Sequence, residues 1–267
     1  MIKFVVTNTQ HGANLRAQPT VSSAVIRNLP FGTLLVLDED TGTKWKKVTV
    51  NGGPHDGATG FVSDVNLTVA RSPAVASLLG AAAHYWTLFD RGNGKENVQP
   101  FKNFVLTMWD ELPASRPPND DTSHPNFPWS AVGMSAFVRK AASYPTFKAS
   151  SGHHRYIKDS VRARFANDNG APFWGFRLTE RKPEVGDLVV QWRQVPRSFD
   201  FVRSVADSDT TFKSHTDLVC EVKDGFLWSL GCNNGHSVAR KRYRLDGNGH
   251  LRAENRTFML MKNVAAA

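Results

Sequence analysis

The chain has 267 residues, enough for one large domain or two small ones, and 40% of them are hydrophobic, which excludes wholesale disorder. Its 33 basic and 24 acidic side chains give a formal net charge of +9, which favours a polyanionic partner: nucleic acid, an anionic membrane surface or an acidic cell wall. The only two cysteines, Cys220 and Cys232, exclude a multi-disulfide scaffold and a zinc site of the CxxC kind.

The chain shows no signal for insertion into or passage across a membrane. No apolar run reaches the roughly 18 residues needed to span a bilayer, and the first residues lack the apolar core of a secretory signal. We therefore expect no membrane span and no signal peptide. The expected location is synthesis in the cytoplasm, followed by action in the periplasm or outside the cell after non-classical export.

The first quarter of the chain predicts short strands. Apolar or alternating runs occur at residues 2–6, 24–26, 34–37, 45–50 and 60–62. Turn signals such as Pro30-Phe31-Gly32 separate them, and no helical period competes. This spacing is typical of a small barrel or sandwich.

Helical spacing then replaces the strand pattern. Ser72 followed by Pro73 predicts a helix start that runs through Trp86. Further helices are expected over residues 101–112, 128–144 and 153–165, with a proline-rich loop at 113–128. After Val185 the pattern is strand-like, at residues 186–192, 216–222, 224–230, 240–245 and 256–261. Helices followed by a run of antiparallel strands indicate an α+β domain. We thus expect an all-β barrel at 1–70 and an α+β domain at 71–267.

The first domain contains, in this order, the segments NLRAQP (14–19), VI (25–26), LPFGT (29–33), WKKV (45–48) and GFV (60–62). In order and spacing, these segments resemble the bacterial SH3 domain. The resemblance implies a wall-binding or targeting module. A barrel used only for contacts between proteins is the alternative.

Three features of the second domain are suited to nucleophilic catalysis. Ser130 opens a predicted helix, where free backbone N–H groups and the helix dipole favour an anionic nucleophile or an oxyanion. His215, at the start of a strand, can act as general base. A polar side chain such as Asn233, or Asp217 on the same strand face as His215, can orient the imidazole.

The order of these features resembles the papain-like murein hydrolases, that is, the cysteine, histidine-dependent amidohydrolase/peptidases and their relatives. The segments that carry the resemblance are PWSA (128–131), PEVGD (183–187), SHTDLV (214–219) and GCN (231–233). The closest likeness is to a branch of uncharacterised function with PWSA at the catalytic position. The resemblance implies that Ser130 replaces the family's cysteine as nucleophile, with His215 as base and Asn233 or Asp217 as the orienting residue.

Serine in place of cysteine leaves three interpretations open. Ser130 can be a working nucleophile, provided that a base lies within hydrogen-bond reach. The domain can instead have lost hydrolysis and kept the ability to bind the wall. Finally, Ser130 can simply cap its helix.

We expect four side chains to line the cleft and bind substrate: Trp129, His153, His154 and Tyr156. Adjacent histidines on a helix point about 100° apart, which makes them poor joint ligands for one metal ion. No HxxxH or HExxH spacing is present. We therefore expect no cofactor and no metal site, and a metal-dependent hydrolase is kept as an alternative.

The function expected from these observations is peptidoglycan hydrolysis, by an amidase or endopeptidase that cleaves a cell-wall peptide. Without a signal peptide, such an enzyme fits an antibacterial toxin or a phage lysin. Its expected partners are peptidoglycan and, for a toxin, an immunity protein or a component of a secretion machine. Nucleic acid is not expected, because no recognisable binding module accompanies the charge. The main rival is a catalytically inactive wall-binding protein.

Overall fold

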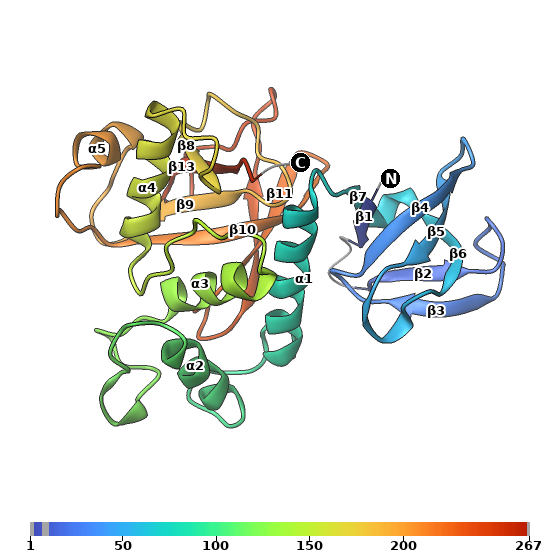
Figure 1. The fold of residues 1–267 in the computed structure, drawn as a ribbon, viewed down its shortest axis with the longest axis horizontal. Coiled ribbons are helices and arrows are strands. Elements are labelled where there is room, and N and C mark those ends of the chain that lie inside the picture. Colours follow the sequence, from blue (N-terminus) through green and yellow to red (C-terminus); the bar gives the residue numbers. More distant parts are fainter. Residues whose placement is uncertain (1–2, 7–10, 266–267) are drawn as a thin grey trace.

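The computed structural model describes residues 3–6 and 11–265, which form two units joined at residues 70–72 (Figure 1). The smaller unit is a seven-stranded antiparallel sheet with the strand order β3-β2-β6-β5-β4-β1-β7. Its strands are β1 (Lys3–Val6), β2 (Ala13–Arg16), β3 (Val25–Leu29), β4 (Leu34–Asp40), β5 (Trp45–Val50), β6 (Thr59–Ser63) and β7 (Leu67–Val69).

The small unit has a core of its own, because alternate residues of its strands point inward. The buried side chains include Val6, Leu15, Leu35, Val48 and Val62, each 0% exposed. This is the β-rich domain that the sequence predicts. Ile2, at the start of the first predicted strand, lies outside the described residues.

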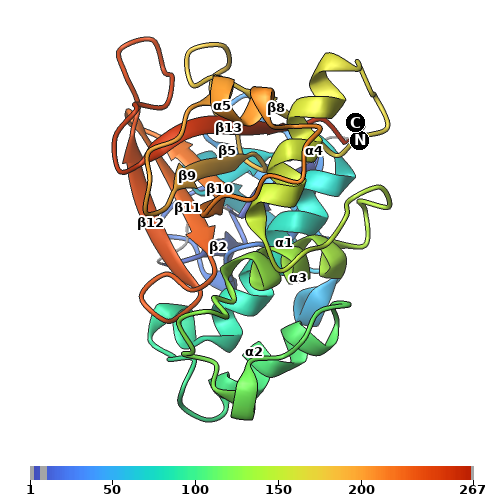
Figure 2. The same cartoon turned by 90° about the vertical axis from the view of Figure 1, so that its left-hand side faces the viewer.

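The larger unit is α+β. Its six strands form an antiparallel sheet in the order β12-β11-β10-β9-β13-β8, and its main helices lie on one face of that sheet (Figure 2). The helices are α1 (Pro73–Leu88), α2 (Phe101–Asp110), α3 (Ser130–Ala141), α4 (His153–Phe165) and α5 (Phe199–Ser204). The strands are β8 (Phe173–Phe176), β9 (Leu188–Trp192), β10 (Ser214–Lys223), β11 (Phe226–Gly231), β12 (Ala239–Arg244) and β13 (Thr257–Asn263).

Local signals place the helix starts well. The hydroxyl of Ser72 accepts a hydrogen bond from the Val75 amide at 3.2 Å, with Pro73 in the first turn, as predicted. The bounds of α4 agree with the predicted 153–165, whereas α3 is shorter than the predicted 128–144. Short elements β8 and α5 were not predicted, because four to six residues carry too little periodicity.

The two units are packed against each other through α1. The ring of Phe31 meets Trp86 edge to face, with 5.9 Å between the centroids. Gly32 has a φ of +82°, and a Cβ atom there would lie 2.4 Å from the Cβ of Ala83. Only glycine permits this approach of the turn to the helix, so the smaller unit packs on the face of α1.

The PEVGD segment, residues 183–187, fixes the junction between the units. The carboxylate of Asp187 is 0% exposed and accepts hydrogen bonds from Arg71 at 2.8 Å and Lys262 at 2.7 Å. Burial raises the pKa of Asp187, against the opposing effect of these two cations. The motif thus ties the linker to β9 and β13, and its role is structural.

Within the described ranges, no helix is both long and apolar enough to cross a membrane.

Candidate active site

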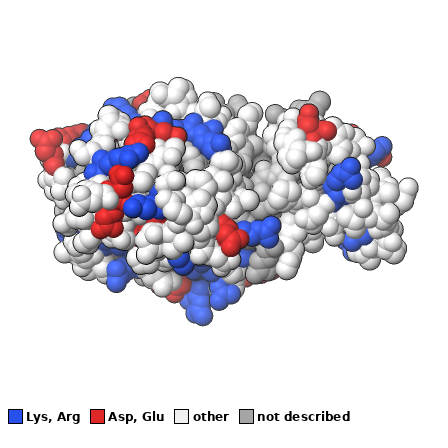
Figure 3. All heavy atoms as spheres, turned by 90° about the horizontal axis from the view of Figure 1, so that it is seen from below, with Lys and Arg blue, Asp and Glu red and all other residues white. Residues whose placement is uncertain are grey.

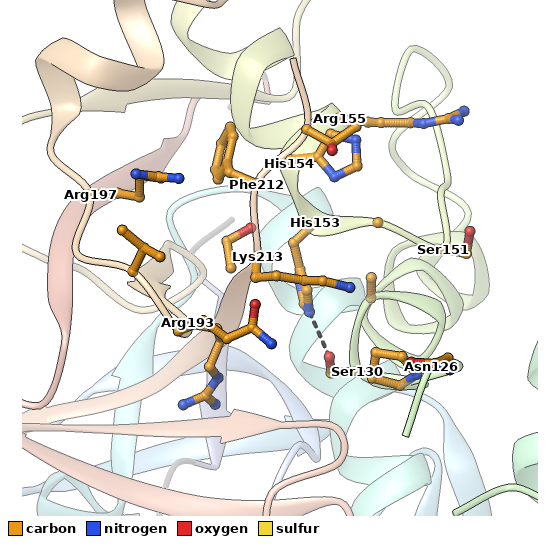
Figure 4. A pocket seen from close by; sticks show the side chains of 17 residues that line it. Asn126, Ser130, Ser151, His153, His154, Arg155, Arg193, Arg197, Phe212 and Lys213 are labelled. Carbon is orange, nitrogen blue, oxygen red and sulfur yellow. Dashed lines mark hydrogen bonds between the residues drawn. The ribbon is translucent and has the colours of Figure 1, made fainter. Parts of the chain in front are cut away.

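Two helices begin at the same place in the larger unit. Ser130 is the first residue of α3, His153 is the first residue of α4, and both helices pack against β10. The hydroxyl of Ser130 and Nε2 of His153 are 2.8 Å apart (Figure 4). A serine and an imidazole are therefore in direct hydrogen-bond contact, which is the geometry of a nucleophile and its base.

Buried contacts hold both helix starts in position. The indole of Trp129 is stacked on Phe89 with 5.4 Å between the centroids, and its N–H donates to the carboxylate of Glu96. The hydroxyl of Ser135 donates to the carbonyl of Ser150 and accepts from its amide, each at 3.0 Å. These bonds fold the chain back so that α4 begins beside α3.

The second nitrogen of His153 meets two hydroxyl groups. Nδ1 lies 3.0 Å from Oγ1 of Thr216 and also contacts the hydroxyl of Tyr156, and the two hydroxyls are 3.2 Å apart. When Ser130 donates to Nε2, Nδ1 carries the proton and donates to one of these oxygens. This arrangement sets the tautomer that a general base requires.

A second histidine lies behind the first. The ring centroids of His153 and His215 are 5.1 Å apart, and Nε2 of His215 lies 2.8 Å from the carboxylate of Asp217. Asp217 is 0% exposed. It also accepts hydrogen bonds from Gln191 at 2.8 Å, Asn234 at 2.9 Å and Tyr243 at 2.5 Å.

The charges of this network follow from burial. Burial, followed by the neighbouring His215, lowers the pKa of His153 well below its ordinary value. Burial also lowers the pKa of His215, although Asp217 opposes the effect. Burial alone would raise the pKa of Asp217, but the charge and hydrogen bond of His215 hold it well below its usual range. At neutral pH both imidazoles are therefore neutral and the carboxylate is ionised.

The start of α3 also supplies amide donors that have no carbonyl partner within the helix. The amide of Gly133 is the first to bond to the preceding turn, donating to the carbonyl of Trp129 at 2.8 Å. The amides of Ser130 and Ala131 precede it, at the positive end of the helix. They are placed to stabilise negative charge beside the Ser130 hydroxyl.

Ser130 and His153 open into a cavity of about 460 Å³ (Figure 4). Its walls come from the two helix starts, the segment after β9 and the segment that leads into β10. The residues that line it are Asn126, Pro128, Ser130, Ala131, Ser151, Gly152, His153, His154, Arg155, Arg193, Gln194, Val195, Arg197, Thr211, Phe212, Lys213 and Ser214.

Other nucleophiles and ligands are less suitably placed. Cys220 and Cys232 are both buried, and burial raises the pKa of each thiol. Across residues 3–6 and 11–265, no three His, Cys, Asp or Glu side chains are grouped so that they could hold a metal ion.

Residues 102–263 match the family model described as "Uncharacterized protein conserved in bacteria (DUF2272)". The chain belongs to this family. Residues 11–68 match the model of the bacterial SH3 domain, which confirms that resemblance. Comparison with curated proteins finds no match. Among solved structures, the chain is similar to NlpC1 from Trichomonas vaginalis over 94% of its own length and 68% of that chain, with 11% identity and a TM-score of 0.24, too low to support any inference.

In this DUF2272 domain the contacts of the two histidines differ from those expected. His215 was predicted to be the base for Ser130, but the imidazole bonded to Ser130 is that of His153, and Nε2 of His215 is bonded to Asp217. Asp217 does share a strand face with His215, as expected. Among the described residues, Asn233 makes no hydrogen bond to His215, and its neighbour Asn234 binds Asp217 instead.

The residues predicted to bind substrate also separate into two groups. Trp129 and Tyr156 are 0% and 2% exposed, so they pack beneath the candidate site of the DUF2272 domain and do not reach a substrate. His153 and His154 line the cavity. Sequence reasoning missed Thr216, Gln191, Tyr243 and the cavity's cations, because no motif marks side chains that only the fold brings together.

Proposed function

We propose that the chain is a serine amidohydrolase that cleaves an amide bond in cell-wall peptides, with Ser130 as nucleophile and His153 as general base. The observation that carries the proposal is the 2.8 Å contact between these two side chains in an open cavity. The sequence order of the serine helix and the following histidine strand, which resembles the papain-like murein hydrolases, supports a papain-like arrangement. The same resemblance supports cell-wall peptides as the substrate, and so does the bacterial SH3 domain.

The proposed reaction follows from the positions of the side chains. The hydroxyl of Ser130 attacks the carbonyl carbon while its proton passes to Nε2 of His153. The oxygen of the tetrahedral intermediate gains negative charge, which the amides of Ser130 and Ala131 stabilise. The imidazolium then protonates the leaving amine, the C–N bond breaks, and an acyl ester remains on Ser130.

Water completes the cycle. His153 removes a proton from a water molecule, which attacks the ester and releases the carboxylic acid and the free hydroxyl of Ser130. While His153 is charged, the hydroxyl of Thr216 or of Tyr156 accepts a hydrogen bond from its Nδ1–H group. The ionised Asp217, held through His215, lies close enough to favour that charge. We propose that His215 and Asp217 are positioning residues, not the groups that touch the substrate.

The test is digestion of purified sacculi by the wild type and by Ser130→Ala, with analysis of the released fragments. The wild type should release peptide fragments with new amino and carboxyl ends, and Ser130→Ala should release none. Equal release by both proteins would overturn the role of Ser130. Binding of both proteins to sacculi without release would favour the rival interpretation, a wall-binding protein without turnover.

A further inference from the structure

The cavity beside Ser130 carries charge of one sign. Its described lining includes Arg155, Arg193, Arg197 and Lys213 and contains no Asp or Glu. None of these four cations forms an ion pair with a described carboxylate. Elsewhere in the same unit, arginines are commonly paired, as Arg164 is with Glu180 at 2.7 Å. The cavity therefore concentrates positive charge that the protein itself does not neutralise.

Strand pairing brings two of these cations together. Trp192 at the end of β9 is opposite Ser214 at the start of β10, so the residues just beyond them, Arg193 and Lys213, leave the sheet at the same edge. The amide of Arg193 donates to the carbonyl of Lys213 at 3.0 Å. Arg193 lies close enough to the site that its charge acts on His153 and His215.

The starts of two helices add to the positive electrostatic potential of this cavity. Ser130 and Ala131 belong to the first turn of α3, and His153, His154 and Arg155 belong to the first turn of α4. The positive ends of both helix dipoles thus lie at one cavity, whose lining also includes the four cations (Figure 4). An anionic group is the ligand that this arrangement favours most strongly.

A small anion fits better than a long polyanion. The unpaired cations surround a single cavity of about 460 Å³. On the face shown in Figure 3, by contrast, basic side chains lie in separate groups with acidic ones between them. A nucleic acid would need a basic surface that extends along its backbone.

We propose that this cavity binds a free carboxylate of the substrate, next to the amide that Ser130 attacks, and that Arg193 and Lys213 are its main contacts. The inference rests on the proposed function and names its substrate class: peptides with an ionised carboxyl group beside the scissile amide, in preference to the same peptides with that carboxyl amidated. Guanidinium and ammonium donors form stronger hydrogen bonds with a carboxylate than with a neutral amide.

Binding is tested without turnover, in full-length Ser130→Ala. Calorimetric titration with glutarate should show binding, and titration with the neutral glutaramide should show affinity at least about tenfold weaker. Adding Arg193→Gln or Lys213→Gln should weaken glutarate binding by about tenfold or more. Arg193→Lys keeps the charge and should retain most of the binding. Arg252→Gln, at an exposed position outside the cavity, is the matched control and should change nothing.

Several results would overturn the proposal. One is equal affinity of the protein for glutarate and glutaramide. Another is unchanged glutarate binding in a folded Arg193→Gln, Lys213→Gln double variant. Tighter binding of inorganic phosphate than of glutarate would assign the cavity to phosphate instead. The binding assay needs no catalysis, so it can succeed even if sacculus digestion fails. The proposal of carboxylate binding and the proposal of hydrolysis by Ser130 are therefore tested independently.

Turnover gives a second measurement. The wild type should cleave muropeptides with a free carboxylate at least about tenfold more efficiently, in kcat/KM, than the amidated forms. Arg193→Gln should reduce this ratio by lowering efficiency on the acidic substrate alone. An unchanged ratio would contradict the assignment.

Discussion

The hydroxyl of Ser130 and Nε2 of His153 lie 2.8 Å apart at the starts of two helices that pack on the same strand. The residues are 23 positions apart, and neither belongs to the strand that carries His215 and Asp217. The proposed base thus comes from a helix, whereas the strand supplies Thr216, His215 and Asp217 behind it. This division of roles leads to different expectations for the two histidines.

Replacing each histidine separately tests which one is the base. His153→Gln should lower kcat by about 10²–10⁴, the range for loss of a general base. His215→Gln should have a smaller effect on kcat and should lower the melting temperature, because Asp217 loses a buried hydrogen-bond partner. The measurements are kcat from amine release and thermal unfolding. A greater loss of kcat in a folded His215→Gln would restore His215 as the base.

The pH profile follows from the burial of His153. The base must be neutral to accept a proton, and burial lowers its pKa well below 6.5. Lowering the pH from 8 to 6.5 should therefore leave kcat/KM unchanged, and activity should fall only as the pH passes through the lowered pKa. An acid-side inflection at or above 6.5 would show that His153 is not the controlling group. The His215→Gln protein is a useful comparison, because removing that neighbour should move the inflection to higher pH.

Ser130→Cys should convert the site into a reactive thiol. A helix start and nearby cations, here Arg193 and Lys213 of the cavity, lower the pKa of a cysteine, commonly to about 3.5–7.5. The native cysteines supply little background, because both are buried and burial raises their pKa. Iodoacetamide at pH 7 should therefore modify Cys at position 130 and leave the wild type unmodified, as read by mass spectrometry. Equal modification of both proteins would mean that the thiol does not experience this environment.

Two glycines in helices provide a matched test of the packing behind the site. A Cβ at Gly133 in α3 would lie 2.5 Å from the Cβ and Sγ of Cys232, so Gly133→Ala should destabilise the protein by about 1–3 kcal/mol. In Gly80→Ala the nearest atom would be 3.9 Å away, and the helix propensity of alanine should stabilise α1 by up to about 1 kcal/mol. Chemical denaturation measures both. Similar effects of the two changes would contradict the packing around Cys232.

Much of the fold follows from patterns that are visible in the chain. The Ser72-Pro73 signal starts α1, the alternation in residues 45–50 forms β5, and the periodicity of 153–165 forms α4. These features are local, so sequence spacing suffices to predict them. The serine at the start of α3 was identified for the same reason, since a helix start can be recognised from a few neighbouring residues.

The choice of partner for Ser130 could not be derived in the same way. It depends on how the segment before α4 folds back, which the bonds between Ser135 and Ser150 determine. The cations of the cavity meet because β9 pairs with β10 in one register. Pairings of this kind are set by the tertiary structure, and no spacing in the sequence encodes them. Without that information, the resemblance to papain-like enzymes assigned the role of general base to His215.

The most direct test of the central claim is covalent labelling of Ser130. A fluorophosphonate reacts with a serine that a neighbouring base has activated, forming a bond to phosphorus and releasing fluoride. Mass spectrometry of the labelled protein should find one adduct, on Ser130, and His153→Gln should lose most of it while His215→Gln retains it. Labelling of Ser130 at the same rate in the wild type and in His153→Gln, or no adduct in the wild type, would contradict the account.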